Sequence, residues 1–72
     1  MSLRRKKRAE HPVTAARRAK GWRLEDLSMA AKCSKPLLSN IEHHYTPQES
    51  TMIRISNALD RSLKQLWPEE WE

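Results

Sequence analysis

Apolar residues recur along the chain at intervals of three and four, the spacing that gathers side chains on one face of an α-helix. The pattern is clearest in the segment that ends at residue 59, whose inward positions are Met52, Ile55, Ser56 and Leu59. Thr46 and Glu49 predict a capping box at its start, with Pro47 as the first helical residue. The dipeptide Asp60-Arg61 is the expected break after this helix.

The same spacing predicts three earlier helices, over residues 12–20, 24–31 and 34–43. The first begins at Pro12 and stops at Gly21, the only glycine, which suits a left-handed cap. Ser34 is a good N-cap for the third, and Pro36 is tolerated in its first turn. The expected inward residues are Val13, Ala16 and Ala19 or the stem of Lys20, then Leu24, Leu27, Ala30 and Ala31, and then Leu37, Leu38 and Ile41.

A second capping box, Ser62-Leu63-Lys64-Gln65, predicts a short fifth helix that ends at Pro68. Leu63 and Leu66 should close the core, with Trp67 as its cap. Trp71 is either a loosely packed tail residue or part of a dimer contact. No segment has the pattern of a strand, so the sequence predicts a compact all-α domain of five helices.

Composition supports one intracellular domain. The 72 residues suffice for a single core, and the absence of Phe and the abundance of Leu, Ala and Met favour helices. A single cysteine excludes an internal disulfide, and no apolar run is long enough for a membrane span or a signal peptide. We therefore expect a soluble cytoplasmic protein that does not enter membranes.

The formal charge of +5 is concentrated at the N-terminus. Residues 1–22 hold eight Lys or Arg against one Glu, whereas residues 47–72 hold three against five acids. Such a field favours a polyanionic partner, nucleic acid before an anionic membrane. We expect a disordered basic arm over 1–10, a domain over 11–68 and a tail over 69–72; the arm's basic run is Arg4, Arg5, Lys6, Lys7 and Arg8.

Two short helices joined by Lys32-Cys33 match the geometry of a helix-turn-helix, in which the second helix enters the major groove of DNA. Three pieces of sequence strengthen this interpretation: Gly21-Trp22, Leu38-Ser39-Asn40-Ile41-Glu42 and Ala58-Leu59. With them, residues 12 to about 67 resemble the Cro/phage-repressor (XRE) family. The resemblance implies a bacterial or phage-type regulator that binds duplex DNA in the nucleoid.

The resemblance also places the base-reading side chains on the helix that follows Ser34: Lys35, Pro36, Leu37 and Asn40. A lysine donates to guanine O6 and N7, and an asparagine makes a bidentate contact to adenine. Pro36 and Leu37 offer only apolar contact, with a thymine methyl group. Few hydrogen bonds would then read the target, and phosphate contacts would supply much of the affinity.

Phosphate contacts are expected from both ends of this motif and from the basic arm. The usual polar residue at the start of the second helix is here Leu24, so Arg23 is the substitute. The other candidates are Ser34, His43, Tyr45 and Thr46. Lys32 and His44 stand where the family has glycine, and Lys32 must adopt a left-handed conformation or a different turn.

The resemblance further implies a structural ion pair between Arg17 and Glu42, which would tie the first helix to the end of the third. Zinc binding by Cys33, His43 and His44 is disfavoured because a fourth ligand is missing, and Cys33 should pack as a small apolar residue. Catalysis is disfavoured because so small a core leaves little room for a substrate pocket. We expect no cofactor, no metal and no enzymatic activity.

Homodimerisation on a palindromic site is expected, because one short helix reads too few bases. Two rival functions remain open. One is a protein-interaction module, such as an antitoxin-type partner, that kept the fold while its third helix lost base contacts. The other is RNA binding through the basic arm.

Overall fold

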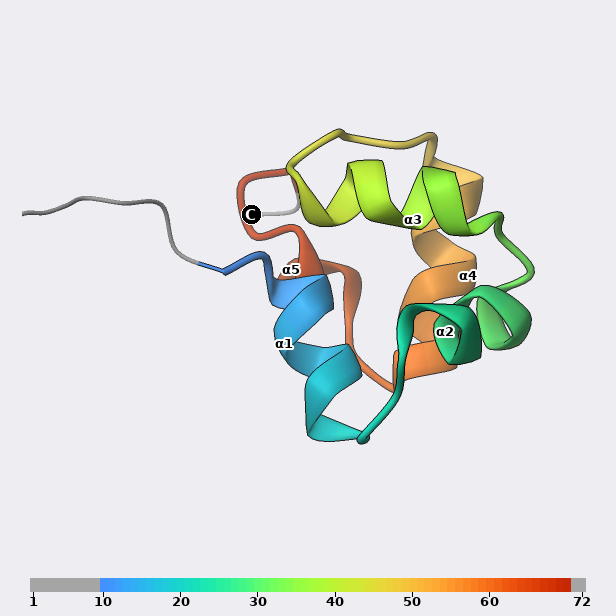
Figure 1. The fold of residues 1–72 in the computed structure, drawn as a ribbon. Helices are drawn as coiled ribbons and strands as arrows, with labels where there is room; N and C mark the ends of the chain where they lie inside the picture. Colours follow the sequence, from blue (N-terminus) through green and yellow to red (C-terminus); the bar gives the residue numbers. More distant parts are fainter. Residues whose placement is uncertain (1–9, 71–72) are drawn as a thin grey trace, which may run out of the picture.

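Five helices follow one another in residues 10–70, the part of the chain that the computed structural model describes, and this part contains no strand (Figure 1). They are α1 (Pro12–Ala19), α2 (Leu24–Ala31), α3 (Lys35–Glu42), α4 (Glu49–Leu59) and α5 (Leu63–Leu66). The prediction of a five-helix all-α domain is therefore confirmed. The basic run over residues 4–8 and the tail residue Trp71 lie outside the described residues.

Helix α3 lies at the edge of the molecule and is covered on one side only. It packs against α1 and α2, while α2 also packs against α4, and α5 bridges α1 and α4 (Figure 1). Leu38 and Ile41 form the covered face of α3 and are fully buried. The opposite face carries the exposed residues Lys35, Pro36 and Asn40, so α3 presents a polar face outward.

All five helices contribute to one apolar core. Burying such side chains is the dominant favourable term in folding, about 1.5–3 kcal/mol for each large aliphatic residue. Trp67 follows α5, is only 4% exposed and closes this core, as predicted. The fully buried side chains are Val13, Leu27, Leu38, Ile41, Ile55, Leu59 and Leu66.

Local capping signals explain where several helices start. Ser34 Oγ accepts the Leu37 N–H at 3.3 Å before α3. In α5 the predicted box is complete, because Ser62 Oγ accepts from the Gln65 N–H at 3.1 Å and Gln65 Oε1 accepts from the Ser62 N–H at 2.8 Å. Each such cap is worth about 0.5–2 kcal/mol, which matters for helices this short.

Four residues just after helices have positive φ, and only one of them is glycine. Gly21 ends α1 as predicted: its own N–H donates to the Arg18 carbonyl, and the Trp22 N–H donates to the Arg17 carbonyl. The three others carry a Cβ into this conformation, which costs about 1 kcal/mol or more each. They are Lys32 (φ 58°), His44 (φ 77°) and Asp60 (φ 56°).

The start of α4 differs from the prediction. The helix begins at Glu49 with Gln48 as its N-cap, and no side chain caps it, so the expected Thr46–Glu49 box does not form. Pro47 is not the first helical residue but lies buried in the extended segment before the helix. Gln48 itself has an extended conformation (φ −64°, ψ 156°), so the helix starts only after it.

Two alanines predicted to face inward are exposed. In α1 the inward stripe runs through Val13, Ala16 and Arg17, because Arg17 turns toward the core side to pair with Glu42, and this leaves Ala19 outside. In α2 the stripe consists of Leu24, Leu27, Ser28 and Ala31, and Ala30 lies beside it. Two buried threonines, Thr14 and Thr51, were not expected in the core.

Candidate nucleic-acid interface

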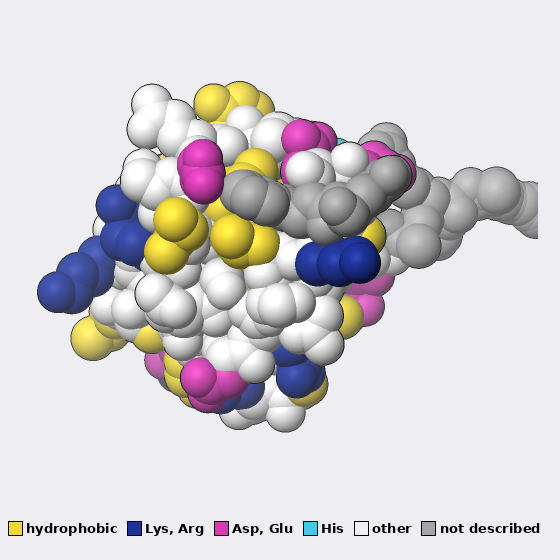
Figure 2. Space-filling model, turned by 180° about the vertical axis from the view of Figure 1, so that it is seen from behind, with side chains coloured by type: hydrophobic (Ala, Val, Ile, Leu, Met, Phe, Trp, Pro, Cys, Tyr) yellow, Lys and Arg dark blue, Asp and Glu magenta, His cyan; other side chains and the backbone are white. Residues whose placement is uncertain are grey.

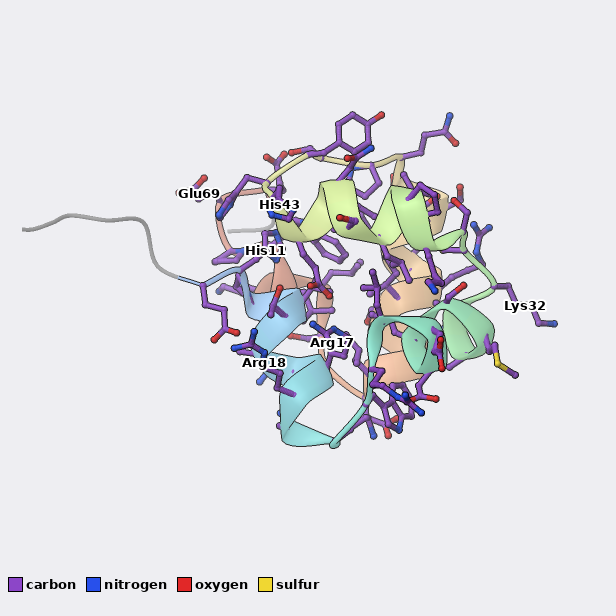
Figure 3. All side chains as sticks on the ribbon, viewed as in Figure 1. His11, Arg17, Arg18, Lys32, His43 and Glu69 are labelled. Atoms are coloured by element: carbon purple, nitrogen blue, oxygen red, sulfur yellow. The ribbon has the colours of Figure 1, made fainter. Side chains whose placement is uncertain are left out.

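The turn between α2 and α3 fixes the angle at which α3 leaves the core. The Cys33 N–H donates to the Ser28 carbonyl at 3.1 Å, and the Ser28 hydroxyl donates to the Cys33 carbonyl. The Cys33 side chain is 7% exposed and belongs to the apolar core. Lys32 takes the left-handed conformation and points its side chain away from the domain (Figure 3). This tight turn gives α2 and α3 the geometry of a helix-turn-helix.

Three of the four side chains predicted to contact bases share the free face of α3. Lys35, Pro36 and Asn40 are exposed, and positions 36 and 40 are one helical turn apart. Leu37 is half-buried and packs partly against the core, so only part of its side chain is available on this face. A lysine and an asparagine that flank an apolar surface are therefore available to a groove, while Leu37 anchors the first turn of α3.

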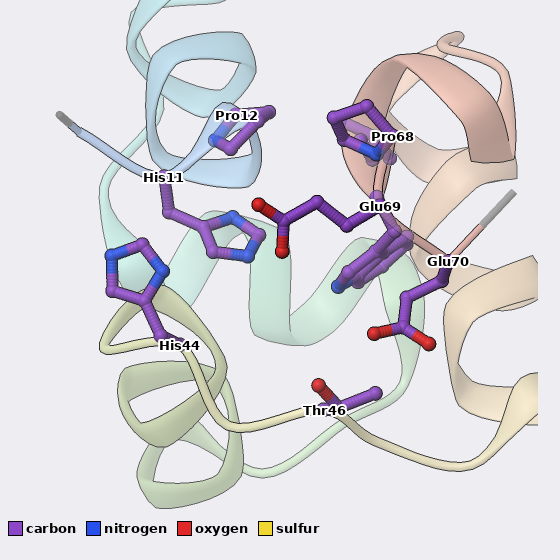
Figure 4. A pocket seen from close by; sticks show the side chains of 9 residues that line it. His11, Pro12, His44, Thr46, Pro68, Glu69 and Glu70 are labelled. Atoms are coloured by element: carbon purple, nitrogen blue, oxygen red, sulfur yellow. The ribbon is translucent and has the colours of Figure 1, made fainter. Parts of the chain in front are cut away.

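The side chains predicted to contact phosphate surround this face unevenly. Arg23 is the N-cap of α2, and its side chain is 83% exposed. Tyr45 is 55% exposed just after α3. His43 Nδ1 lies 2.7 Å from the Ser39 carbonyl oxygen, a contact in which this nitrogen carries the proton. Thr46, in contrast, lines a hollow behind the end of α3 (Figure 4).

This hollow has a volume of about 190 Å³ and lies between the start of α1, the end of α3 and the segment after α5 (Figure 4). His11 and His44 lie side by side along one side of it, with ring centroids 5.2 Å apart (Figure 4). His11 is buried and caps α1, because its Nδ1 accepts the Val13 N–H at 3.0 Å. Burial lowers the pKa of His11, the neighbouring His44 lowers it further, and the carboxylate of Glu42 opposes the shift.

Arg17 and Glu42 join α1 to the last turn of α3. Arg17 donates from Nε to Glu42 Oε2 at 2.8 Å and from Nη2 to Glu42 Oε1 at 3.1 Å, and its Nη1 donates to the Trp22 carbonyl at 2.9 Å. The two side chains are only 13% and 10% exposed. The hydrogen bonds to Glu42 raise the pKa of Arg17 above its ordinary value, so its guanidinium remains charged at any physiological pH. This bidentate pair holds the last turn of α3 against α1.

One charged residue near the recognition face was not singled out in the sequence. Glu25 lies in the first turn of α2, where acids are favoured by the helix dipole. Because this local role accounts for an acid at position 25, the sequence does not indicate the contacts of Glu25 with Arg23 and Lys35. In the structure its two oxygens approach two cations: Oε2 lies 3.8 Å from Arg23 Nη2, and Oε1 lies 3.7 Å from Lys35 Nζ. Glu25 therefore lies beside two of the predicted DNA-contacting side chains.

The family model described as helix-turn-helix matches residues 13–66, three quarters of the chain. The chain belongs to the Cro/phage-repressor (XRE) type of helix-turn-helix protein. Membership implies DNA binding, typically in transcriptional regulators, and the family is typically not enzymatic. No curated protein and no solved structure shows a significant similarity to the chain.

Charge is almost balanced over the folded part of this XRE-type domain. Residues 10–70 hold nine Lys or Arg and eight Asp or Glu, a net charge of +1, whereas residues 1–9 hold five Lys or Arg and no acid. On the face shown in Figure 2, the Lys and Arg side chains form one group at the left edge and separate groups at the right and at the bottom. Most of the net positive charge of the chain therefore belongs to residues 1–9.

Two features of residues 10–70 bear on other functions. No helix within residues 10–70 is both long enough and apolar enough to cross a lipid bilayer. Nowhere in the same stretch do three or more His, Cys, Asp or Glu side chains gather in a way that would hold a metal ion.

Proposed function

We propose that this XRE-type domain is a sequence-specific transcriptional regulator of the repressor type that places α3 in the major groove of duplex DNA. The observation that carries the proposal is the free face of α3, on which exposed Lys35 and Asn40 flank exposed Pro36. The opposite face of α3 is buried, and its end is fixed by the ion pair of Glu42. A rigid helix with a polar outer face suits a groove that displays donors and acceptors.

Each side chain on the face has a chemistry that matches particular bases. The Lys35 ammonium donates to guanine O6 and N7, and the Asn40 amide pairs with adenine N6 and N7. Each contact of this kind discriminates by about 1–3 kcal/mol against a wrong base. Pro36 offers an apolar surface to a thymine methyl group. Half-buried Leu37 contributes its remaining exposed edge to the same contact and otherwise fixes the first turn of α3.

Phosphate contacts set the register of α3 in the groove. Arg23 and Ser34 approach the backbone on one side of α3, and His43, Tyr45 and Thr46 do so on the other. The basic run over residues 4–8 (Arg4, Arg5, Lys6, Lys7 and Arg8) follows an adjacent groove or the backbone. Because the folded part has a net charge of only +1, this run supplies most of the counterion release.

The regulator acts as a homodimer on DNA. Two copies related by a two-fold axis would place their α3 helices about 34 Å apart, in successive major grooves, on a palindromic site. Analytical ultracentrifugation of the protein with such a duplex should show two chains per site. A one-to-one complex at saturating protein would contradict the dimer and leave base reading by a single α3 intact.

Selection from a pool of random duplexes is the experiment that tests the proposed function. We expect enrichment of a palindrome and an affinity that falls steeply with salt. If no sequence is enriched and no affinity remains at low salt, a protein-interaction module with an unused α3 is the better account. If RNA hairpins bind more tightly than any duplex, and deletion of residues 4–8 abolishes this, the arm is an RNA-binding segment.

A further inference from the structure

The carboxylate of Glu25 connects the two helices of the DNA-binding motif through their cations. One oxygen lies 3.8 Å from Nη2 of Arg23, which precedes α2, and the other lies 3.7 Å from Nζ of Lys35, which opens α3. The three side chains are between 50% and 83% exposed, so they remain free to meet DNA. A negative charge therefore stands at the surface that a polyanion would approach.

Glu25 is not needed to start α2, because its neighbour does that. Asp26 Oδ2 accepts the Arg23 N–H at 2.8 Å and so satisfies the first free N–H group of the helix. The ion pairs of Glu25 are exposed, and pairs of that kind contribute little to stability. The helix dipole favours an acid at this position, but it does not require that the two carboxylate oxygens approach Arg23 and Lys35.

We propose that Glu25 is a positioning residue that sets the sequence specificity of the domain through Lys35, an inference that rests on the proposed function. The Lys35 ammonium has three N–H donors and no acceptor. The ion pair with Glu25, at 3.7 Å, restrains the long side chain beside the start of α3 without a hydrogen bond, so the N–H donors remain for guanine O6 and N7. Without Glu25 the ammonium is free to turn toward the nearest phosphate, where it carries no sequence information.

The negative charge of Glu25 also weakens binding to DNA sequences that Lys35 does not read. If Lys35 and Arg23 both moved to phosphates, the carboxylate would be left unpaired and facing a polyanion. This repulsion is relieved only when Lys35 stays beside Glu25, which is the arrangement that reads a base. Glu25 therefore weakens binding to unselected sequences more than it weakens binding to the selected one.

The test compares Glu25→Gln with Asp60→Asn at one salt concentration. Asp60 is also an exposed acid that pairs with a lysine, with Oδ2 3.5 Å from Lys20 Nζ, but it lies at the end of α4. Asparagine tolerates the positive φ of this position, so both variants remove one charge and keep the fold. Fluorescence anisotropy gives the Kd of each protein for the selected duplex and for a scrambled duplex.

We expect Glu25→Gln to bind the scrambled duplex more tightly. The ratio of the Kd for the scrambled duplex to the Kd for the selected duplex should fall by about twofold to fivefold, the range of an exposed ion pair. Asp60→Asn should shift both Kd values alike and leave the ratio unchanged. In a Lys35→Ala background, Glu25→Gln should lower the ratio no further. A further fall there would show that Glu25 does not act through Lys35, and would overturn the inference.

The same measurements distinguish a failure of the inference on Glu25 from a failure of the proposed function. If the unmodified protein discriminates between the duplexes and Glu25→Gln keeps the same ratio, the inference on Glu25 is wrong and the proposed function stands. If the unmodified protein does not discriminate at all, the proposed function is wrong and the inference falls with it. Thermal unfolding of each variant, with midpoints close to that of the unmodified protein, shows that the fold is intact.

Discussion

Arg17 donates hydrogen bonds to both carboxylate oxygens of Glu42, 25 residues further along the chain, and so joins the end of α3 to α1. The guanidinium also donates to the Trp22 carbonyl, which ties the turn after α1 to the same centre. Loss of either partner would leave a largely buried charge without compensation. The position of α3 in the domain therefore depends on the ion pair between Arg17 and Glu42.

Replacement of Arg17 or Glu42 by alanine should lower the free energy of unfolding by about 3–5 kcal/mol. For a domain of this size the thermal midpoint should fall by at least about 12 °C, measured by circular dichroism. Arg18→Ala is the matched control: Arg18 pairs with Glu10 at 2.8 Å, but its side chain points outward and is 68% exposed (Figure 3). A loss equal to that of Arg17→Ala would contradict the structural role of the Arg17–Glu42 pair.

Stability should fall as the pH drops below about 6.5, partly because of His11. Its pKa is lowered in the folded state by burial and by His44, so the unfolded chain takes up the proton first. The free energy of unfolding is then highest above about pH 6.5 and declines toward the folded-state pKa. Protonation of Nδ1 would also remove the acceptor of the Val13 N–H that caps α1.

His11→Asn tests this dependence, because asparagine caps a helix and does not titrate. Urea unfolding at pH 7.5, 6.5 and 5.5 should show a smaller decline for His11→Asn than for the unmodified protein. Parallel profiles for the unmodified protein and His11→Asn would show that His11 does not carry the effect.

Lys32→Gly should stabilise the domain by about 0.5–1 kcal/mol. Lys32 holds φ 58° and ψ 46°, a conformation that glycine adopts without the Cβ penalty, and its side chain is exposed. Ala15→Gly in the exposed part of α1 should have the opposite sign and cost a similar amount. If both glycines destabilise in denaturant titrations, the turn does not impose the strain inferred from φ.

Deletion of residues 4–8 should weaken binding to all duplexes alike. Five basic side chains would be lost, so the slope of log K against log salt should become shallower by up to about 4 to 5 units. Substitution of the same five residues by glutamine should have the same effect and keeps the chain length. A change confined to the selected sequence would show instead that the arm reads bases.

Much of the fold was predictable because its signals are local. Gly21, Ser34 and Ser62 mark helix ends through contacts within three residues, and each does in the structure what the sequence indicated. The apolar spacing likewise fixed the order and number of helices. The start of α4 was misplaced because Thr46 and Glu49 fit a capping box in sequence, while in the structure the extended N-cap is Gln48.

The site was predictable only in part, since several of its features join distant segments. The contact between His11 and His44 brings together residues 33 positions apart, and no local pattern signals it. The choice between Glu25 and Asp26 as helix cap depends on the turn before α2, so the sequence could not tell which acid was free to meet Lys35. Leu37 illustrates the same limit: its position in α3 suggested base contact, and the sequence did not show that part of its side chain packs against the core.

The most direct test of the central claim, that the free face of α3 reads bases, is the affinity of Asn40→Ala for the selected duplex and for duplexes with one base pair changed. We predict that Asn40→Ala loses discrimination at one adenine position by about 1–3 kcal/mol, while its preferences elsewhere and its salt dependence stay unchanged. Uniform weakening across all duplexes, with every base preference retained, would contradict base reading by α3 and reduce Asn40 to a phosphate contact.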